Sequence, residues 1–186
     1  VGLEMPRGPT GRLSLEVHYH NETGEMVPDR SGVRACVTTR KREHAAAVSL
    51  LGTELLTIIP GETHFTGICT PIFNVVTQEP IHILNSMPHM HRRGRHITTT
   101  IHRRDGSTEL LLDAPFDFDN QILHETPNVL NPGDWLSTTC TYESQDFAVF
   151  GIRTEDEMCQ NYITTWPAGR LDTGGSLIFE AHACML

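Results

Sequence analysis

Several features that mark other classes of protein are missing from this sequence of 186 residues. It has no run of about 18 apolar residues, so no membrane span is predicted. Basic residues number 14 against 23 acidic ones, for a formal net charge of -9. That balance argues against a nucleic-acid partner, because such proteins carry a basic face. Repeats and low-complexity tracts are absent too, and the length suits one domain, or one domain plus a fragment.

Zinc-finger spacing is also missing. None of the five cysteines stands in a Cys-x-x-Cys pair, so a structural zinc site is not expected. An odd count leaves one cysteine over if the others pair. The chain starts at Val1 with no signal-peptide pattern after it, and we expect it to be processed or cut from something longer.

Histidine, by contrast, is abundant. The chain has 11, and two of them, His89 and His91, are separated by one residue. On an extended strand, residues i and i+2 point to the same face, so both imidazoles could converge on one ion. A third donor must come from elsewhere, and Met158 is the best candidate. Two imidazoles and a thioether suit copper cycling between Cu(I) and Cu(II) far better than magnesium or calcium.

Two other methionines compete for the role of the thioether ligand. Met90 points away from the two histidines on a regular strand. Met87 shares their face, but Pro88 disrupts the geometry between it and His89, so Met87 ranks second. The ordinary alternative for any single methionine is a place in the core.

The rest of the chain has the pattern of short strands joined by turns. Leu13 to Asn21 alternate between apolar and polar side chains, which predicts a half-buried strand. Residues 21–32 are polar and rich in turn formers, which predicts a linker. A turn at 154–157 should precede a strand reaching Trp166. The other expected strands include 73–76, 81–84, 96–102, 110–112, 135–142 and 177–183, with turns at 60–61, 105–106 and 132–134. This organisation is typical of an all-β sandwich or barrel.

Several motifs, in order, resemble the copper type II, ascorbate-dependent monooxygenases, a family that includes dopamine β-hydroxylase and peptidylglycine α-hydroxylating monooxygenase. LEVHYHN at 15–21 is similar to the strand that ends the family's first catalytic domain. The other motifs resemble its second catalytic domain: IIPGET at 58–63, HMH followed by GR at 89–95, NPGD at 131–134, CTY at 140–142 and EMC at 157–159. The resemblance covers nearly the whole chain.

The resemblance implies an antiparallel β-sandwich of jelly-roll type in three parts. Residues 1–20 would be the closing strand of a mostly absent first copper domain, 21–32 a linker, and 33–186 the second copper domain. It implies His89, His91 and Met158 as the copper ligands of the second domain. His18 would be one of three histidine ligands in the first domain. The other two, an adjacent His-His pair, have no counterpart in this chain.

The family's cysteine pairing implies two disulfides, Cys140 with Cys159 and Cys69 with Cys184, and leaves Cys36 unpaired. Disulfides imply an oxidising compartment: secretion, a vesicle lumen or the periplasm. The glycosylation sequon that begins at Asn21 is compatible with that location.

The function implied is hydroxylation of a C–H bond with copper, O2 and ascorbate, with electrons relayed from an N-terminal copper domain in cis or trans. The peptide-amidating branch has an arginine two residues before the first histidine, and this chain has Met87 there. A small amine-like organic substrate is therefore expected. Two alternatives remain open. One is a catalytically incomplete copper-binding or interaction module, and the other is a zinc-dependent hydrolase that adds a carboxylate to the two histidines.

Overall fold

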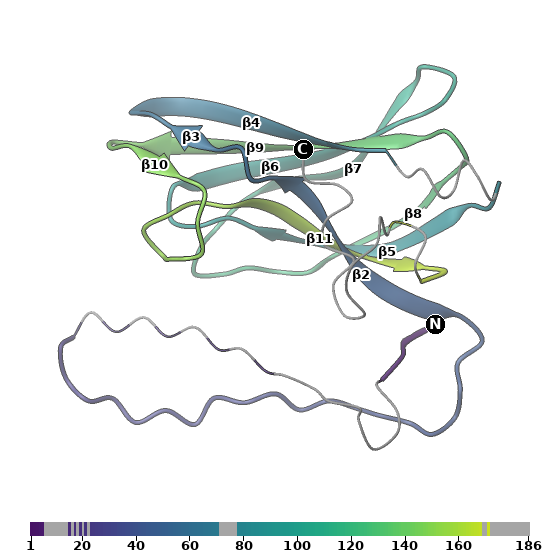
Figure 1. Ribbon diagram of the computed structural model, residues 1–186, viewed down its shortest axis with the longest axis horizontal. Helices are drawn as coiled ribbons and strands as arrows, with labels where there is room; N and C mark the ends of the chain where they lie inside the picture. The colour runs from purple at the N-terminus through teal and green to yellow at the C-terminus, as the bar shows by residue number, and fades with distance from the viewer. Residues whose placement is uncertain are drawn as a thin grey trace.

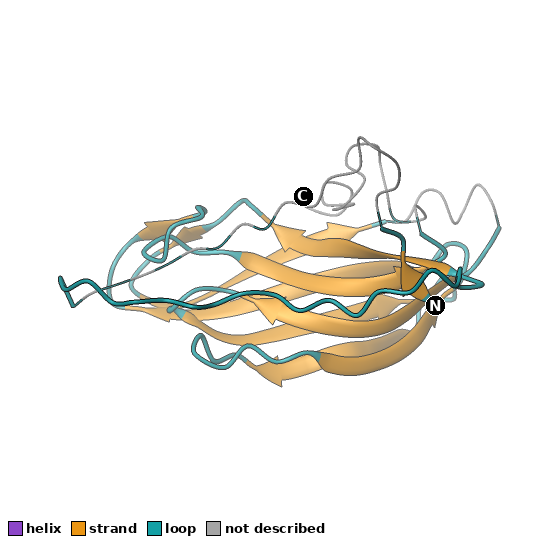
Figure 2. Cartoon of the chain, turned by 90° about the horizontal axis from the view of Figure 1, so that it is seen from below, coloured by secondary structure: helices purple, strands orange, loops and turns teal. Residues whose placement is uncertain are grey.

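The computed structural model describes residues 1–5, 15, 17, 19, 21, 23–70, 78–168 and 171. Within these ranges all regular secondary structure is β-strand (Figure 2). The strands are β1 (Gly2–Leu3), β2 (Ala45–Thr53), β3 (Thr57–Ile58), β4 (Gly61–Cys69), β5 (Ile81–His89), β6 (Gly94–His102), β7 (Thr108–Pro115), β8 (His124–Leu130), β9 (Trp135–Ser144), β10 (Ala148–Val149) and β11 (Cys159–Trp166). In this part of the chain no helix is long and apolar enough to cross a membrane.

Two sheets form the body of the molecule (Figure 1). One has the strand order β1-β2-β11-β5-β8 and the other β4-β9-β6-β7, while β3 and β10 pair separately. Apart from the short parallel contact of β1 with β2, the pairings are antiparallel. The predicted all-β antiparallel sandwich is therefore confirmed.

Alternation along the strands builds the core between the two sheets. In β6, Ile97, Thr99 and Ile101 are fully buried, as the apolar face predicted for 96–102 requires. From the opposite sheet, Asn161 donates a hydrogen bond to the Thr99 hydroxyl at 2.9 Å. Thr99 in turn pairs with Thr138 at 3.0 Å. A short polar chain therefore crosses the interior and links the two sheets.

The turns that join the strands follow the predicted chemistry. Asp105-Gly106 connects β6 to β7, and Gly106 has a φ of 87°. Gly133, before β9, has a φ of 94°. Glycine is the residue that adopts this left-handed region without strain. The predicted turn at 154–157 and the strand after it are also confirmed, since β11 begins at Cys159.

The strand expected at Leu13 to Asn21 is not found at the residues described there. Leu15, Val17 and Tyr19 belong to no strand and are exposed. Apolar alternation forms a strand only where a neighbouring sheet edge pairs with it. Residues 23–40, which follow in the chain, run as a long loop apart from both sheets (Figure 1). The strands predicted at 73–76 and 177–183 fall outside the described residues, as does His18.

One irregularity in β5 decides which way its last residues face. Ile81 and Ile83 point into the core. Opposite β11, Ile83 pairs with Thr165 and Asn85 with Thr164, so one extra residue is inserted between them. This β-bulge shifts the alternation, as bulges do beside functional sites. Beyond it, Ser86 and Pro88 are buried instead.

Candidate metal centre

His89 and His91 lie at the end of β5, and the structure brings their rings together. The ring centroids are 5.5 Å apart and the planes are nearly perpendicular, at 87°. The strand itself ends at His89, and His91 begins the turn that leads to β6. Met90, between them, is fully buried and belongs to an apolar cluster of the core.

Hydrogen bonds determine which ring nitrogens remain available. His89 Nδ1 lies 2.8 Å from Oε1 of Gln121. The Gln121 amide nitrogen donates to the carbonyl of Phe118 at 3.2 Å, so its oxygen faces His89 and accepts. Nδ1 of His91 donates to the carbonyl of Asp156 at 2.9 Å, because a carbonyl can only accept. Both imidazoles therefore carry their proton on Nδ1, which leaves the Nε2 lone pairs for a metal. Metal-binding histidines show this arrangement.

The charge state of His89 suits the same role. Burial lowers the pKa of its imidazole and the neighbouring His91 lowers it further, while the hydrogen bond with Gln121 acts in the opposite direction. The net shift is downward, which favours the neutral ring that coordinates metals.

The residues just before β11 hold His91 from two sides. The Asp156 carbonyl orients its ring. The carboxylate of Glu157, which is completely buried, accepts the backbone N–H of His91 at 2.8 Å and that of Arg93 at 2.7 Å. Met158 is the next residue, so the predicted thioether ligand comes from the segment bound to His91.

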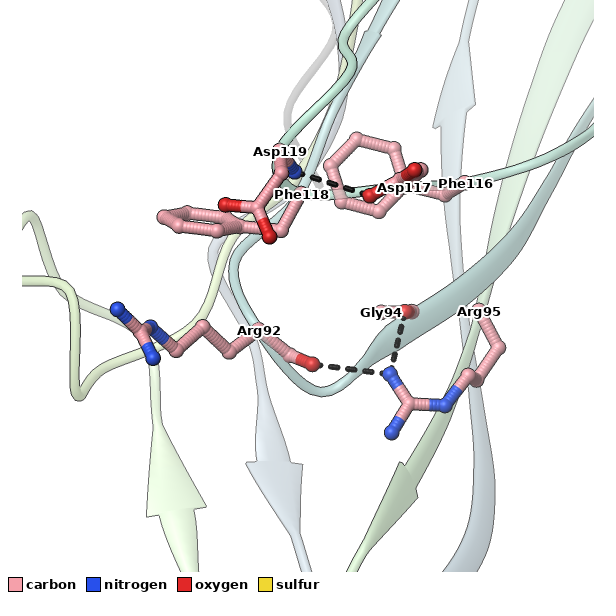
Figure 3. A pocket seen from close by; sticks show the side chains of 7 residues that line it. All are labelled: Arg92, Gly94, Arg95, Phe116, Asp117, Phe118 and Asp119. Carbon is pink, nitrogen blue, oxygen red and sulfur yellow. Dashed lines mark hydrogen bonds between the residues drawn. The ribbon is translucent and has the colours of Figure 1, made fainter.

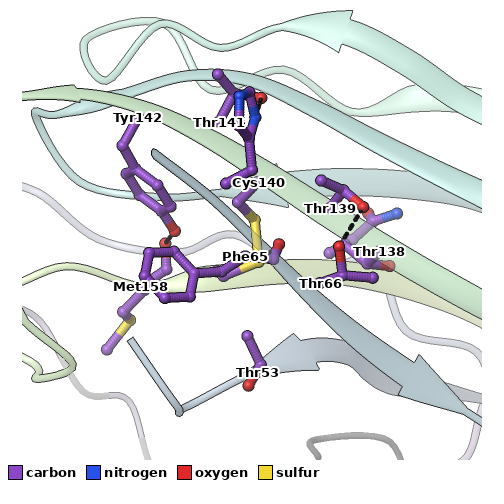
Figure 4. The surroundings of a disulfide bond; sticks show 12 residues. Thr53, Phe65, Thr66, Thr138, Thr139, Cys140, Thr141, Tyr142 and Met158 are labelled. Carbon is purple, nitrogen blue, oxygen red and sulfur yellow. Dashed lines mark hydrogen bonds between the residues drawn. A yellow bond between two sulfur atoms is a disulfide. The ribbon is translucent and has the colours of Figure 1, made fainter. Parts of the chain in front are cut away.

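Met158 itself is fixed on both flanks. Its carbonyl accepts a hydrogen bond from the Tyr142 hydroxyl at 2.7 Å. Cys159 forms a disulfide with Cys140 of β9, and the two Cα atoms are 5.7 Å apart. This bond joins the two sheets, and the Met158 side chain extends away from it (Figure 4). The predicted Cys140–Cys159 pair is confirmed.

For the remaining cysteines, the structure tests only part of the predicted pairing. Cys69 is disulfide-bonded, but Cys184 lies outside the described residues, so that pairing stays a prediction. Cys36 is free and exposed.

The available donors fit copper better than zinc. Within the described ranges, no group of three His, Cys, Asp or Glu side chains could hold a metal ion. The nearby Glu157 carboxylate is occupied by two backbone N–H donors. Among the described residues the two imidazoles thus have no carboxylate partner, and the predicted thioether would complete a donor set that favours copper. The ligand role of Met158 stays a prediction.

A hollow of about 330 Å³ lies between the turn that follows His91 and the segment 116–119. Figure 3 shows two arginines on one side and the 116–119 segment on the other. Phe118 joins it to the histidines, since its ring lies edge-on to His91 with centroids 6.4 Å apart. The Arg92 guanidinium sits over the same ring, 5.4 Å from its centroid. On the other side of the pair, the Tyr162 ring approaches that of His89, at 6.1 Å.

Sequence reasoning missed Gln121, Glu157 and Tyr142 as parts of this centre. Tyr142 and Glu157 stand out in the sequence only as members of the CTY and EMC motifs. Nothing in the sequence marks Gln121, which is 32 residues from its partner.

Comparison with known proteins gives a consistent result. Residues 44–180 match the family described as copper type II ascorbate-dependent monooxygenase, C-terminal domain. Human dopamine beta-hydroxylase is 34% identical over 180 residues, covering 89% of this chain and 29% of that protein. MOXD1 homolog 1 of Drosophila melanogaster is 33% identical over 180 residues, covering 88% and 26%. Human DBH-like monooxygenase protein 1 is 35% identical over 187 residues, covering 90% and 30%. The chain thus spans less than a third of each relative.

Proposed function

The chain belongs to the copper type II, ascorbate-dependent monooxygenase family, and from this we propose that it is the oxygen-activating copper domain of a C–H hydroxylase. His89, His91 and Met158 are the proposed ligands. Bound copper would supply the one-electron redox chemistry with which oxygen is activated. The observation that carries the proposal is the pair of adjacent imidazoles. Both use Nδ1 for a hydrogen bond within the protein and leave Nε2 available for a metal, beside the segment that bears Met158.

The chain's own residues have three tasks in this proposal. Gln121 and the Asp156 carbonyl hold the Nδ1 protons and so keep the coordinating nitrogens bare. Phe118 packs against His91 and shields that side from water. Tyr162 and Met87, which pair across β11 and β5, flank His89 on the outer face of the sheet, where a substrate would approach.

The proposed substrate is a small, amine-like organic molecule. Met87 stands two residues before His89 and contributes an uncharged thioether there, so this position offers no cation for a substrate carboxylate. Relatives at 34–35% identity bear the name dopamine beta-hydroxylase, which points to the same class.

We extend the proposal to the partners of this domain. Ascorbate would be the electron source, through a second copper domain present in cis or in trans, of which His18 would be a ligand. The Cys140–Cys159 disulfide fits secretion, a vesicle lumen or the periplasm, because cytosolic proteins rarely keep such bonds.

Copper loading and X-ray absorption of the reduced protein test the ligand set. We expect a single tightly bound copper ion with a sulfur neighbour in the wild type. Met158→Leu should remove the sulfur signal, and His89→Ala should abolish tight binding. Met87→Leu is the matched control and should keep the sulfur signal. A sulfur signal lost in Met87→Leu and kept in Met158→Leu would contradict the assignment.

Oxygen consumption with ascorbate and a phenethylamine, in the presence of the second copper domain, tests activity. Substrate-dependent uptake is expected in the wild type and not in Met158→Leu. Copper binding without uptake would favour the non-catalytic module. Zinc bound without a sulfur neighbour would favour the hydrolase.

A further inference from the structure

The carboxylate of Glu157 occupies an unusual position for an acidic side chain. It is fully buried, and its two oxygens accept separate backbone N–H groups, from Arg93 and from His91. The Arg93 guanidinium lies 4.0 Å away. A buried carboxylate is tolerated only where hydrogen bonds and an opposite charge compensate it. Here the guanidinium and both of these N–H groups come from the turn that contains His91.

Glu157 links the two parts of the predicted copper site. Its carboxylate binds the backbone N–H of His91, which carries one imidazole. In the sequence Glu157 immediately precedes Met158, whose carbonyl accepts a hydrogen bond from Tyr142. Its backbone is fixed as well, because Glu157 N donates to the Val149 carbonyl at 3.0 Å. The side chain of Glu157 thus spans the gap between two chain segments 66 residues apart in sequence.

We propose that Glu157 is a positioning residue that sets the separation of His91 and Met158, so that copper affinity depends on it beyond its effect on stability. This inference rests on the proposed function, since it assumes that the two residues share a metal. Residues that orient metal ligands through hydrogen bonds commonly change affinity by about 10–100-fold when they are replaced.

A second buried carboxylate in the same molecule supplies the control. Asp134 is 2% exposed. It also accepts two backbone N–H groups, from Asn131 at 2.9 Å and Arg104 at 3.1 Å, and it pairs with Arg103 at 2.7 Å. Its contacts match those of Glu157 in kind, yet they hold loops that carry no predicted ligand.

The two substitutions Glu157→Gln and Asp134→Asn are therefore compared. Each places an amide NH2 against a backbone N–H donor, so both should lower the urea midpoint of the metal-free protein. Cu(I) affinity is measured by competition with a chromogenic chelator, and the Cu(II) site by electron paramagnetic resonance. We expect Glu157→Gln to weaken Cu(I) binding by at least about 10-fold and to alter the Cu(II) spectrum. Asp134→Asn should leave both near wild type.

The outcomes distinguish the positioning role of Glu157 from the proposed function of the copper site. Loss of affinity in both variants to the same degree, or in neither, would overturn the positioning role while wild-type copper binding stands. Failure of the wild type to bind copper would instead remove the proposed function. If Glu157→Gln does not fold, Glu157→Asp decides. It keeps the charge but is one methylene shorter and cannot reach both N–H groups, so an intermediate loss of affinity is expected and wild-type affinity would refute the role.

Discussion

Gln121 Oε1 lies 2.8 Å from Nδ1 of His89, and this contact determines which nitrogen of the imidazole carries the proton. Replacing Gln121 with Leu removes the acceptor and frees the ring to rotate or change tautomer. We expect copper affinity to fall by about 10–100-fold. The pKa of His89 should also fall, because the lost hydrogen bond is the contribution that raises it. NMR titration of the metal-free protein measures the second effect.

The control for this prediction is Gln121→Glu. A carboxylate at the same place favours the charged imidazole, so the pKa of His89 should rise rather than fall. Shifts in the same direction for both variants would show that the contact does not act on His89.

The Cys140–Cys159 disulfide should account for a large share of the stability. It closes a loop with a sequence separation of 19, for which the chain-entropy model gives about 3 kcal/mol. The double variant Cys140→Ala/Cys159→Ala should therefore lose about that amount in urea unfolding. Cys36→Ala, at the free and exposed cysteine, should unfold like the wild type. Equal midpoints for the double variant and the wild type would contradict the prediction.

Tyr142 anchors Met158 through a buried hydroxyl. Tyr142→Phe leaves the Met158 carbonyl without this donor, and a buried group left unpaired costs about 1–3 kcal/mol. Thermal and urea unfolding should show this loss. Tyr19→Phe removes a hydrogen bond of the same length, 2.7 Å, to Asp29, but on the surface. Its effect should stay below about 0.5 kcal/mol, and a larger effect there than at Tyr142 would refute the anchoring role.

Acid should weaken the protein partly through Asp134. Burial by itself raises the pKa of this carboxyl, but hydrogen bonds from Arg103, Asn131 and Arg104 outweigh it and hold the pKa below its usual value. A carboxyl with a depressed folded-state pKa contributes stability above its unfolded pKa, about 3.9, and loses it as the pH falls through the folded value.

The urea midpoint of the wild type should therefore drop steeply below about pH 4. The drop should be shallower in Asp134→Asn, which has no such proton to take up. Identical slopes in the two proteins between pH 5 and the acid limit would contradict this assignment.

Local patterns in the sequence predicted the parts of the fold that depend on local rules. Alternation identified the buried face of β6, and Asp105-Gly106 identified the β6–β7 hairpin, because side-chain period and turn conformation depend on neighbouring residues. The same logic failed at Leu15, Val17 and Tyr19, which alternate with polar residues in the sequence but belong to no strand. Burial depends on the partner, which a single strand does not specify.

The residues of the candidate site also differ in whether local sequence patterns could predict them. His89 and His91 were predicted from their spacing alone. Met158 was the best candidate for the third donor, and the family resemblance then implied it as a ligand. The outward direction of His89 depends on a bulge that the apolar pattern does not reveal. Gln121 and Glu157 act across 32 and 66 residues. Contacts of that range are set by how the sheets pack, and no local spacing encodes them.

The extra residue in β5 makes the count of residues before the histidines as decisive as their identity. Deleting Leu84 would remove the bulge and restore unbroken alternation, with Pro88 still facing the core and His89 still facing outward. Inserting one residue after Asn85 would instead turn the end of the strand over, so that His89 would enter the apolar interior and Pro88 would take its place on the outer surface. This insertion of one residue should therefore abolish metal binding while every proposed ligand remains in the chain.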